Sequence, residues 1–107
     1  MKKTINKTDN NNNRTTFLTT LGLAKRAGKL VVGWDRISDY IGEINTIFVS
    51  SDASDRTLKN AKSKCDAIFT DYSMTELGSA LGIKKVAVIA VTDSGFSTLL
   101  TSKLFEK

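Results

Sequence analysis

The sequence predicts an α/β domain in which helices cover both faces of a single sheet. Three observations lead to this fold class. The chain of 107 residues is long enough for one domain with its own core. From Thr16 onward, segments with apolar residues at helical spacing alternate with short extended segments. Several of the extended segments are continuous apolar runs, which are typical of strands buried on both faces.

The first half of the chain contains two predicted helices and two predicted strands. A first helix starts with Thr15 or Thr16 as its N-cap and stops at Gly28. Its apolar face consists of Phe17, Leu21, Ala24 and Ala27. Residues 29–32 form a short strand that ends at Gly33. The next helix has an apolar face made of Ile37, Tyr40, Ile41 and Ile44, and a buried strand follows over residues 46–50.

The second half continues the alternation of helices and strands. Asp52 or Ser54 caps a third helix, whose inner face consists of Leu58, Ala61 and Cys65. Residues 67–69 form a third strand. A fourth helix ends at Gly82 and has an inner face of Met74, Leu77 and Leu81. Residues 86–91 form the strongest strand, which we place at the centre of the sheet. The inner face of the closing helix consists of Phe96, Leu99, Leu100 and Leu104.

Residues 1–15 differ in composition from the rest of the chain. They are polar and basic, they include four consecutive asparagines, and they contain almost no apolar side chains. Such a segment cannot bury enough apolar surface to offset the entropy lost on ordering. We therefore predict a disordered tail over residues 1–15 and one α/β domain over residues 16–107. Four cations and one carboxylate within residues 1–16 account for three of the five net positive charges, so the domain itself is only mildly basic.

The composition excludes several classes of function. The chain has no histidine, so Ser–His and Cys–His nucleophile pairs cannot form. Cys65 is the only cysteine, so it has no partner for an internal disulfide, and without histidine the chain has no plausible set of zinc ligands. We therefore predict that Cys65 is a small buried side chain. We expect no enzymatic activity, no cofactor, no metal and no small-molecule substrate. The sequence shows no membrane-spanning run and no secretory signal, which predicts a cytoplasmic protein without a membrane partner.

The segment Gly33-Trp34-Asp35-Arg36 is the strongest candidate for a binding site. A glycine ahead of a helix start lets a ligand approach the backbone closely, and the amides of a helix start suit anionic groups. Trp34 either packs as a lid on the core or offers a face on which a base can stack. Asp35 also fits as a charge that favours the helix start.

Three lysine-rich clusters have ordinary structural explanations beside a functional one. Lys25, Arg26 and Lys29 surround the end of the first helix, where the helix dipole favours cations. Lys59, Lys62 and Lys64 lie opposite the apolar stripe of the third helix and fit a solvated helix face. Lys84 and Lys85 are adjacent in the turn before the central strand.

Four blocks of sequence together resemble one known family. They are residues 21–33 (LGLAKRAGKLVVG), residues 52–54 (DAS) with Thr57, Lys59 and Cys65, residues 76–82 (ELGSALG) and residues 90–96 (AVTDSGF). In this order and spacing they resemble the bacterial branch of the kink-turn-binding ribosomal-protein family, which includes relatives of archaeal large-subunit protein seven-Ae and of ribosomal protein thirty-e. The resemblance runs from about Phe17 to Leu104.

The resemblance implies a three-layer α/β/α sandwich around a small mixed sheet, and a ribosomal-type protein that binds sharply bent RNA. Its partner would be ribosomal RNA or another kink-turn RNA, in or near the ribosome. Family members contact RNA with the turn after the first strand and the loop after the fourth helix. The corresponding residues here are Lys29, Gly33, Trp34, Asp35, Arg36, Asp39, Ile83, Lys84 and Lys85.

The turn also departs from the family pattern. Archaeal members carry Gly-Thr-Asn-Glu followed by a lysine, whereas this chain has Gly33-Trp34-Asp35-Arg36 followed by Asp39. An ionised Asp35 only accepts hydrogen bonds, and Arg36 only donates them. Asp35 and Asp39 lower the local positive potential and favour an alternative, in which the scaffold is a protein-interaction module with weakened RNA recognition.

Overall fold

The computed structural model describes the backbone of residues 2–105 and the side chains of residues 14–104. Its elements are α1 (Lys2–Arg26), β1 (Leu30–Val32), α2 (Trp34–Asp39), β2 (Thr46–Val49), α3 (Asp55–Lys64), β3 (Ile68–Phe69), α4 (Met74–Leu81), β4 (Val88–Val91) and α5 (Ser94–Phe105). The sheet has the order β1-β4-β2-β3. Strand β4 is antiparallel to both neighbours, and β2 and β3 are parallel.

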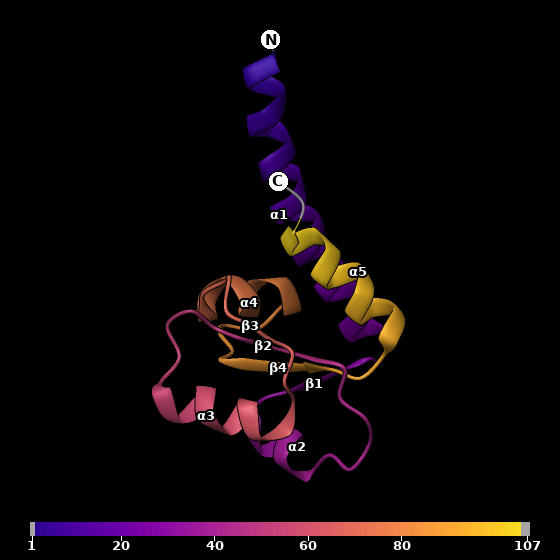
Figure 1. Cartoon of the computed structure of the whole chain (residues 1–107), viewed down its shortest axis with the longest axis vertical. Coiled ribbons are helices and arrows are strands. Elements are labelled where there is room, and N and C mark those ends of the chain that lie inside the picture. The colour runs from indigo at the N-terminus through magenta and orange to yellow at the C-terminus, as the bar shows by residue number, and fades with distance from the viewer. Residues whose placement is uncertain (1, 106–107) are drawn as a thin grey trace.

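The helices form one layer on each side of this sheet. Figure 1 shows α1, α4 and α5 on one side and α2 and α3 on the other. The predicted three-layer α/β/α sandwich around a small mixed sheet is therefore confirmed, and β4 is central as predicted. None of the helices in the described part of the chain is long and apolar enough to cross a membrane.

The sheet is buried on both faces because its central strands alternate side chains between two core clusters. In β4, Ile89 and Val91 belong to the cluster under α1, α4 and α5, whereas Val88 and Ala90 belong to the cluster under α2 and α3. Strand β2 alternates in the same way, and all four of its residues are buried. A strand covered on both faces has no polar alternation, which explains its continuous apolar sequence.

Three aromatic rings join α1 to the sheet and to the segment before α4. The ring of Phe17 stacks on Tyr72, with centroids 4.7 Å apart, and meets Phe48 of β2 edge-on at 5.2 Å. Phe17, Leu21 and Ala24 are fully buried, so the predicted inner face of the first helix is largely correct. Ala27 lies beyond the end of α1 and is exposed.

Helix α1 begins earlier than predicted. It runs continuously from Lys2, so neither Thr15 nor Thr16 is an N-cap. The first turns of α1 project from the globule (Figure 1), whereas the sequence predicts a disordered tail over residues 1–15. The helix stops where expected, because Gly28 adopts a positive φ of 75° and a helix ends readily at such a residue.

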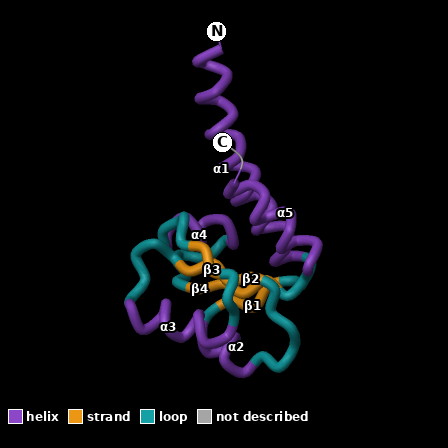
Figure 2. The backbone as a smooth tube through the Cα atoms, in the orientation of Figure 1, coloured by secondary structure: helices purple, strands orange, loops and turns teal. Residues whose placement is uncertain are grey.

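Helix α2 is shorter than predicted. It ends at Asp39, and Figure 2 shows the connection from α2 to β2 as a loop. Ile41 is fully exposed, so its predicted place on an inner helix face is wrong. Ile37 is the one fully buried residue of α2, and Trp34 packs against the same core cluster. The apolar spacing continued past the helix end because Ile44 packs against the same core cluster from the loop.

Smaller corrections concern single side chains. Leu100 is fully buried on α5, but Leu99 is 45% exposed and does not face inward. Cys65 follows α3 as its C-cap and is half-buried, with its Sγ atom 3.9 Å from the Ile44 carbonyl oxygen. Ser54, not Asp52, caps α3, because its side chain accepts the N–H of Thr57.

Candidate nucleic-acid interface

Three segments that are distant in the sequence meet where β1 and β2 end and β4 begins. The Gly33 N–H donates to the Val88 carbonyl oxygen at 3.0 Å, and the Ser50 N–H donates to the Ala87 carbonyl oxygen at 2.8 Å. We call this region, made of residues 33–36, 50–53 and 85–87, the Gly33 end of the sheet. It exists because β4 runs antiparallel to β1 and β2, which brings their last residues beside its first ones.

Gly33 makes the turn from β1 into α2. Its φ of 91° and ψ of 145° lie in a region that side-chain-bearing residues rarely adopt. Nothing lies within 4 Å of the position that a Cβ atom would occupy, so the backbone conformation alone requires glycine here. The turn borders a surface hollow of about 430 Å³ that is lined by Val32, Gly33, Trp34, Asp35 and Arg36.

Trp34 is partly buried and packs against the core cluster under α2 and α3. Of the two roles predicted for Trp34, packing on the core is therefore observed. Part of the indole stays accessible, and Trp34 also lines the hollow beside Gly33. The ring is thus held in place by the core while one part of its surface faces solvent.

The charged residues of α2 all point to solvent. Asp35, Arg36 and Asp39 are exposed, and Asp35 and Asp39 are four residues apart, on one face of the helix. The buried Ile37 fixes this orientation, because it pins the opposite face to the core. Arg36 is therefore free to donate hydrogen bonds to a ligand at the hollow.

The loop after α4 doubles back along its own helix. The Ile83 N–H donates to the Gly78 carbonyl oxygen at 2.9 Å, and the Val86 N–H donates to that of Met74 at 3.1 Å. Ile83, Lys84 and Lys85 are exposed, as a binding loop requires. Since the loop runs from the end of α4 toward its start, Lys85 is the predicted loop residue that belongs to the Gly33 end.

Lys29 is not brought to this site, contrary to the sequence-based prediction. It precedes β1, and its carbonyl oxygen accepts the Thr92 N–H at the far end of β4. Four residues of extended chain separate Lys29 from Gly33, which is about 13 Å. Lys29 therefore lies at the opposite end of the sheet.

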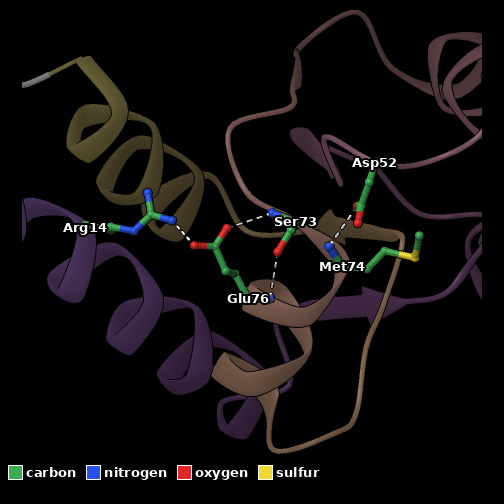
Figure 3. A network of polar contacts seen from close by, with 5 residues as sticks. All are labelled: Arg14, Asp52, Ser73, Met74 and Glu76. Atoms are coloured by element: carbon green, nitrogen blue, oxygen red, sulfur yellow. Dashed lines mark hydrogen bonds and ion pairs between the residues drawn. The ribbon is translucent and has the colours of Figure 1, made fainter.

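Asp52 joins the Gly33 end, although its sequence position predicts a helix cap for α3 rather than a part of the site. Its Oδ1 atom accepts the N–H of Met74 at 3.0 Å, so it caps the start of α4 instead (Figure 3). This hydrogen bond holds the pKa of Asp52 below its usual value, and the charge of Lys85 acts in the same direction. The Val86 N–H donates to the Met74 carbonyl oxygen, so Asp52 and the loop after α4 meet at the start of α4.

A polar network fixes α4 against α1 (Figure 3). Ser73 and Glu76 form a capping box, in which each side chain accepts the other residue's backbone N–H. Arg14 of α1 forms an ion pair with Glu76, and its guanidinium lies 4.7 Å from the centre of the Tyr72 ring. Because the loop after α4 packs on α4, this network also positions that loop.

The predicted site carries no excess of positive charge. Arg36, Lys84 and Lys85 are offset by Asp35, Asp39 and Asp52. Among the described residues, no group of three or more His, Cys, Asp or Glu side chains is arranged to hold a metal ion. What distinguishes the site is its shape: a glycine turn with a positive φ and a partly open indole line one hollow, and an exposed lysine loop lies at the same end of the sheet.

The fold and this site define a small α/β/α domain that presents a glycine turn and a lysine loop at one end of a mixed sheet. No protein-family model matches the chain. Two curated proteins, both named RNA-binding protein YlxQ, are similar to it. The protein from Bacillus subtilis (strain 168) is 37% identical over 90 residues, which cover 78% of this chain and 90% of that protein. The protein from Enterococcus faecium is 34% identical over 97 residues, which cover 82% and 90%.

A solved structure supports the same relationship. A protein of unknown function from Bacillus halodurans is 32% identical and superimposes with a TM-score of 0.77, covering 84% of this chain and 97% of its own. The chain belongs to the family of the YlxQ proteins.

Proposed function

We propose that this protein binds RNA, and that it recognises kink-turn or similarly bent RNA at the Gly33 end of the sheet. The observation that carries RNA binding is membership of a family whose curated relatives are named RNA-binding proteins. The choice of site rests on the hollow at the Gly33 turn and on the exposed lysine loop beside it. Ribosomal RNA and the ribosome are the expected partners, in the cytoplasm.

Each part of the site has a role in this proposal. The glycine turn lets the RNA backbone approach, because no side chain fills the space above Gly33. The open part of the Trp34 ring stacks on an unpaired base. Arg36 donates to acceptor atoms of a guanine, such as O6 and N7, and Lys84 and Lys85 contact phosphates.

A titration of a kink-turn duplex against an unkinked duplex of equal length tests the proposal. Tighter binding of the kink-turn duplex is expected, with a loss of about tenfold for the Arg36→Gln variant, since a specific base contact contributes roughly 1–3 kcal/mol. Arg26→Gln is the matched control, because Arg26 is also exposed but lies near Lys29, at the opposite end of the sheet. Equal, weak binding of both duplexes would refute the kink-turn part of the proposal.

The balanced charges of the site favour one second candidate, a protein-interaction module. Asp35 and Asp39 on one exposed face of α2 would suit a basic protein partner. A pull-down from cell lysate with and without nuclease separates the two functions. Partners that persist after nuclease treatment, together with no RNA preference in the titration, would favour this second candidate.

A further inference from the structure

Helix α3 carries a second basic surface that the proposed site does not include. Arg56, Lys59 and Lys62 are exposed on α3, while Ala61 and Leu58 pack into the core on its other side. Among the described side chains, none of these three cations forms an ion pair or a side-chain hydrogen bond. They line a surface hollow of about 550 Å³ together with Asp55, Leu58 and Asn60. We call these three cations the α3 basic face.

The α3 basic face adjoins the Gly33 end of the sheet. Helix α3 starts just after residues 50–53 of the Gly33 end, and Arg56 in its first turn is the cation of α3 nearest to them in the sequence. Helices α2 and α3 lie in the same layer (Figure 1), and the Lys64 Nζ atom donates to the Ser38 carbonyl oxygen at 3.1 Å. Both helices therefore lead away from the Gly33 end in the same direction.

The other cations of the lysine-rich clusters around α1 and α3 either form hydrogen bonds or lie far from the Gly33 end. Lys64 is occupied by its hydrogen bond to the end of α2. Lys25 donates to the Leu81 carbonyl oxygen at 3.3 Å, as a cation at the end of α4. Arg26 and Lys29 lie at the opposite end of the sheet. Apart from Lys84 and Lys85 of the proposed site, the α3 basic face is the described one of these clusters that combines exposed cations with a position next to residues 50–53 of the Gly33 end.

The Gly33 end has no net positive charge, so RNA bound there requires another surface to attract its phosphates. Contacts to phosphates supply much of the affinity in protein–nucleic acid complexes. Three carboxylates offset the three cations of the proposed site, whereas the hollow on α3 contains three cations and only one carboxylate, Asp55. The α3 basic face can therefore provide the phosphate attraction that the Gly33 end lacks.

We propose that the α3 basic face binds the phosphate backbone of one helical arm of the RNA whose bend lies at the Gly33 end. Successive members are three residues apart, which separates them by about 4.5 Å along the helix axis. They extend away from the bend, so they contact only RNA that continues beyond it. This inference rests on the proposed function, because it assumes that RNA occupies the Gly33 end.

The test compares three kink-turn RNAs: one with two short arms, and two in which either one arm or the other is extended. The double variant Arg56→Gln/Lys59→Gln is titrated with all three, across a series of salt concentrations. Arg26→Gln/Lys103→Gln is the control, because it removes the same two residue types from helices on the other face of the sheet. Thermal unfolding of both variants checks that the fold is retained.

The variant is expected to lose about tenfold in affinity for one of the long-arm RNAs and nothing for the short-arm RNA. The slope of log affinity against log salt should fall by about 2, near one unit for each lost phosphate contact. The control should retain the wild-type affinity and slope. Equal affinities of variant and wild type for all long-arm RNAs would overturn the inference, as would an equal loss on the short-arm RNA.

Failure of the proposed function gives a different result. If the wild type does not prefer kink-turn to straight RNA, yet the α3 variant still loses affinity only for the longer RNA, then the kink-turn proposal fails and α3 remains an RNA surface. A wild-type protein that binds none of these RNAs would refute both.

Discussion

Asp52 shows how one side chain links two loops of the candidate site. It follows β2 by three residues and caps the start of α4, where Val86 of the lysine loop also bonds to the backbone of Met74. The Met74 N–H would otherwise be one of the unsatisfied donors at a helix start. The carboxylate therefore holds the loop after β2 against the start of α4. The lysine loop packs on α4 before it enters β4, so the same contact helps to position that loop.

Replacing Asp52 with Asn should reveal this role through the pH dependence of stability. The variant keeps an oxygen acceptor but loses the charge. Because the folded-state pKa of Asp52 lies below the ordinary value of 3.8, the charged carboxylate stabilises the folded state. This stabilisation is present above pH 3.8 and is lost as the pH falls through the lower, folded-state pKa.

Urea unfolding of wild type and Asp52→Asn between pH 7 and pH 2 checks this expectation. The wild type should be more stable at neutral pH, and the difference in unfolding free energy should close below about pH 3.8. A difference that stays constant across the series would mean that the charge of Asp52 contributes nothing to folding.

At the scale of elements, α4 is the support on which the lysine loop lies. Gly78 sits in the middle of α4 and is buried. A Cβ atom at this position would come within 2.5 Å of the Lys85 Cα atom. The loop can return along the helix only because residue 78 has no side chain, so this glycine sets the position of Lys84 and Lys85.

Gly78→Ala should therefore destabilise the protein, although alanine normally favours a helix. The helix-propensity gain is about 1 kcal/mol, but the clash with the loop backbone should outweigh it and leave a net loss of roughly 1–3 kcal/mol. Chemical unfolding measures the change. The neighbouring variant Ser79→Ala, at an exposed position of the same helix, should alter stability by less than about 0.5 kcal/mol. A stabilising effect of Gly78→Ala would contradict the close packing.

At the scale of the whole molecule, Arg14 and Phe17 hold α1 to the rest of the fold. Arg14 pairs with Glu76, and Phe17 packs between Tyr72 and Phe48. The preceding residues are polar and rich in asparagine, which is a poor helix former. We therefore propose that the folded unit starts near Arg14 and that residues 1–13 add little to its stability.

Deleting residues 1–13 should change the unfolding free energy by less than about 0.5 kcal/mol. By contrast, Phe17→Ala in the full chain should cost about 3–5 kcal/mol, because a fully buried aromatic ring is removed. Urea unfolding of both proteins provides the comparison. A loss of more than about 1 kcal/mol on deletion would show that the first turns of α1 stabilise the domain.

Local sequence features predicted the secondary structure well where their physical cause is local. Gly28 and Gly82 end helices because both adopt positive φ angles, and turn chemistry of this kind is visible in the sequence. The spacing rules failed at Ile41 and Leu99, which are exposed. An apolar residue at helical spacing is buried only if another element covers it, and spacing alone does not contain that information.

The same limit applied to the candidate site. The Gly33 turn was predicted from four adjacent residues, and the structure places a hollow there. The sequence does not identify Asp52 and Gly78 as parts of the site. Asp52 bonds to Met74, which is distant in the sequence, and Gly78 packs against Lys85, which lies across the turn after α4. The prediction for Lys29 is wrong, because β1 carries the chain from Lys29 along the whole width of the sheet before it reaches Gly33.

The sequence by itself determined the fold class, the absence of histidine chemistry and the turn at which a ligand can approach the backbone. These properties depend on composition, periodicity and single glycines, which act over a few residues. The tertiary structure decided which cations share an end of the sheet with that turn. Strand order and direction fix those positions: β4 pairs antiparallel with β1 and β2, which brings Gly33, Asp52 and Lys85 together and sends Lys29 to the opposite end.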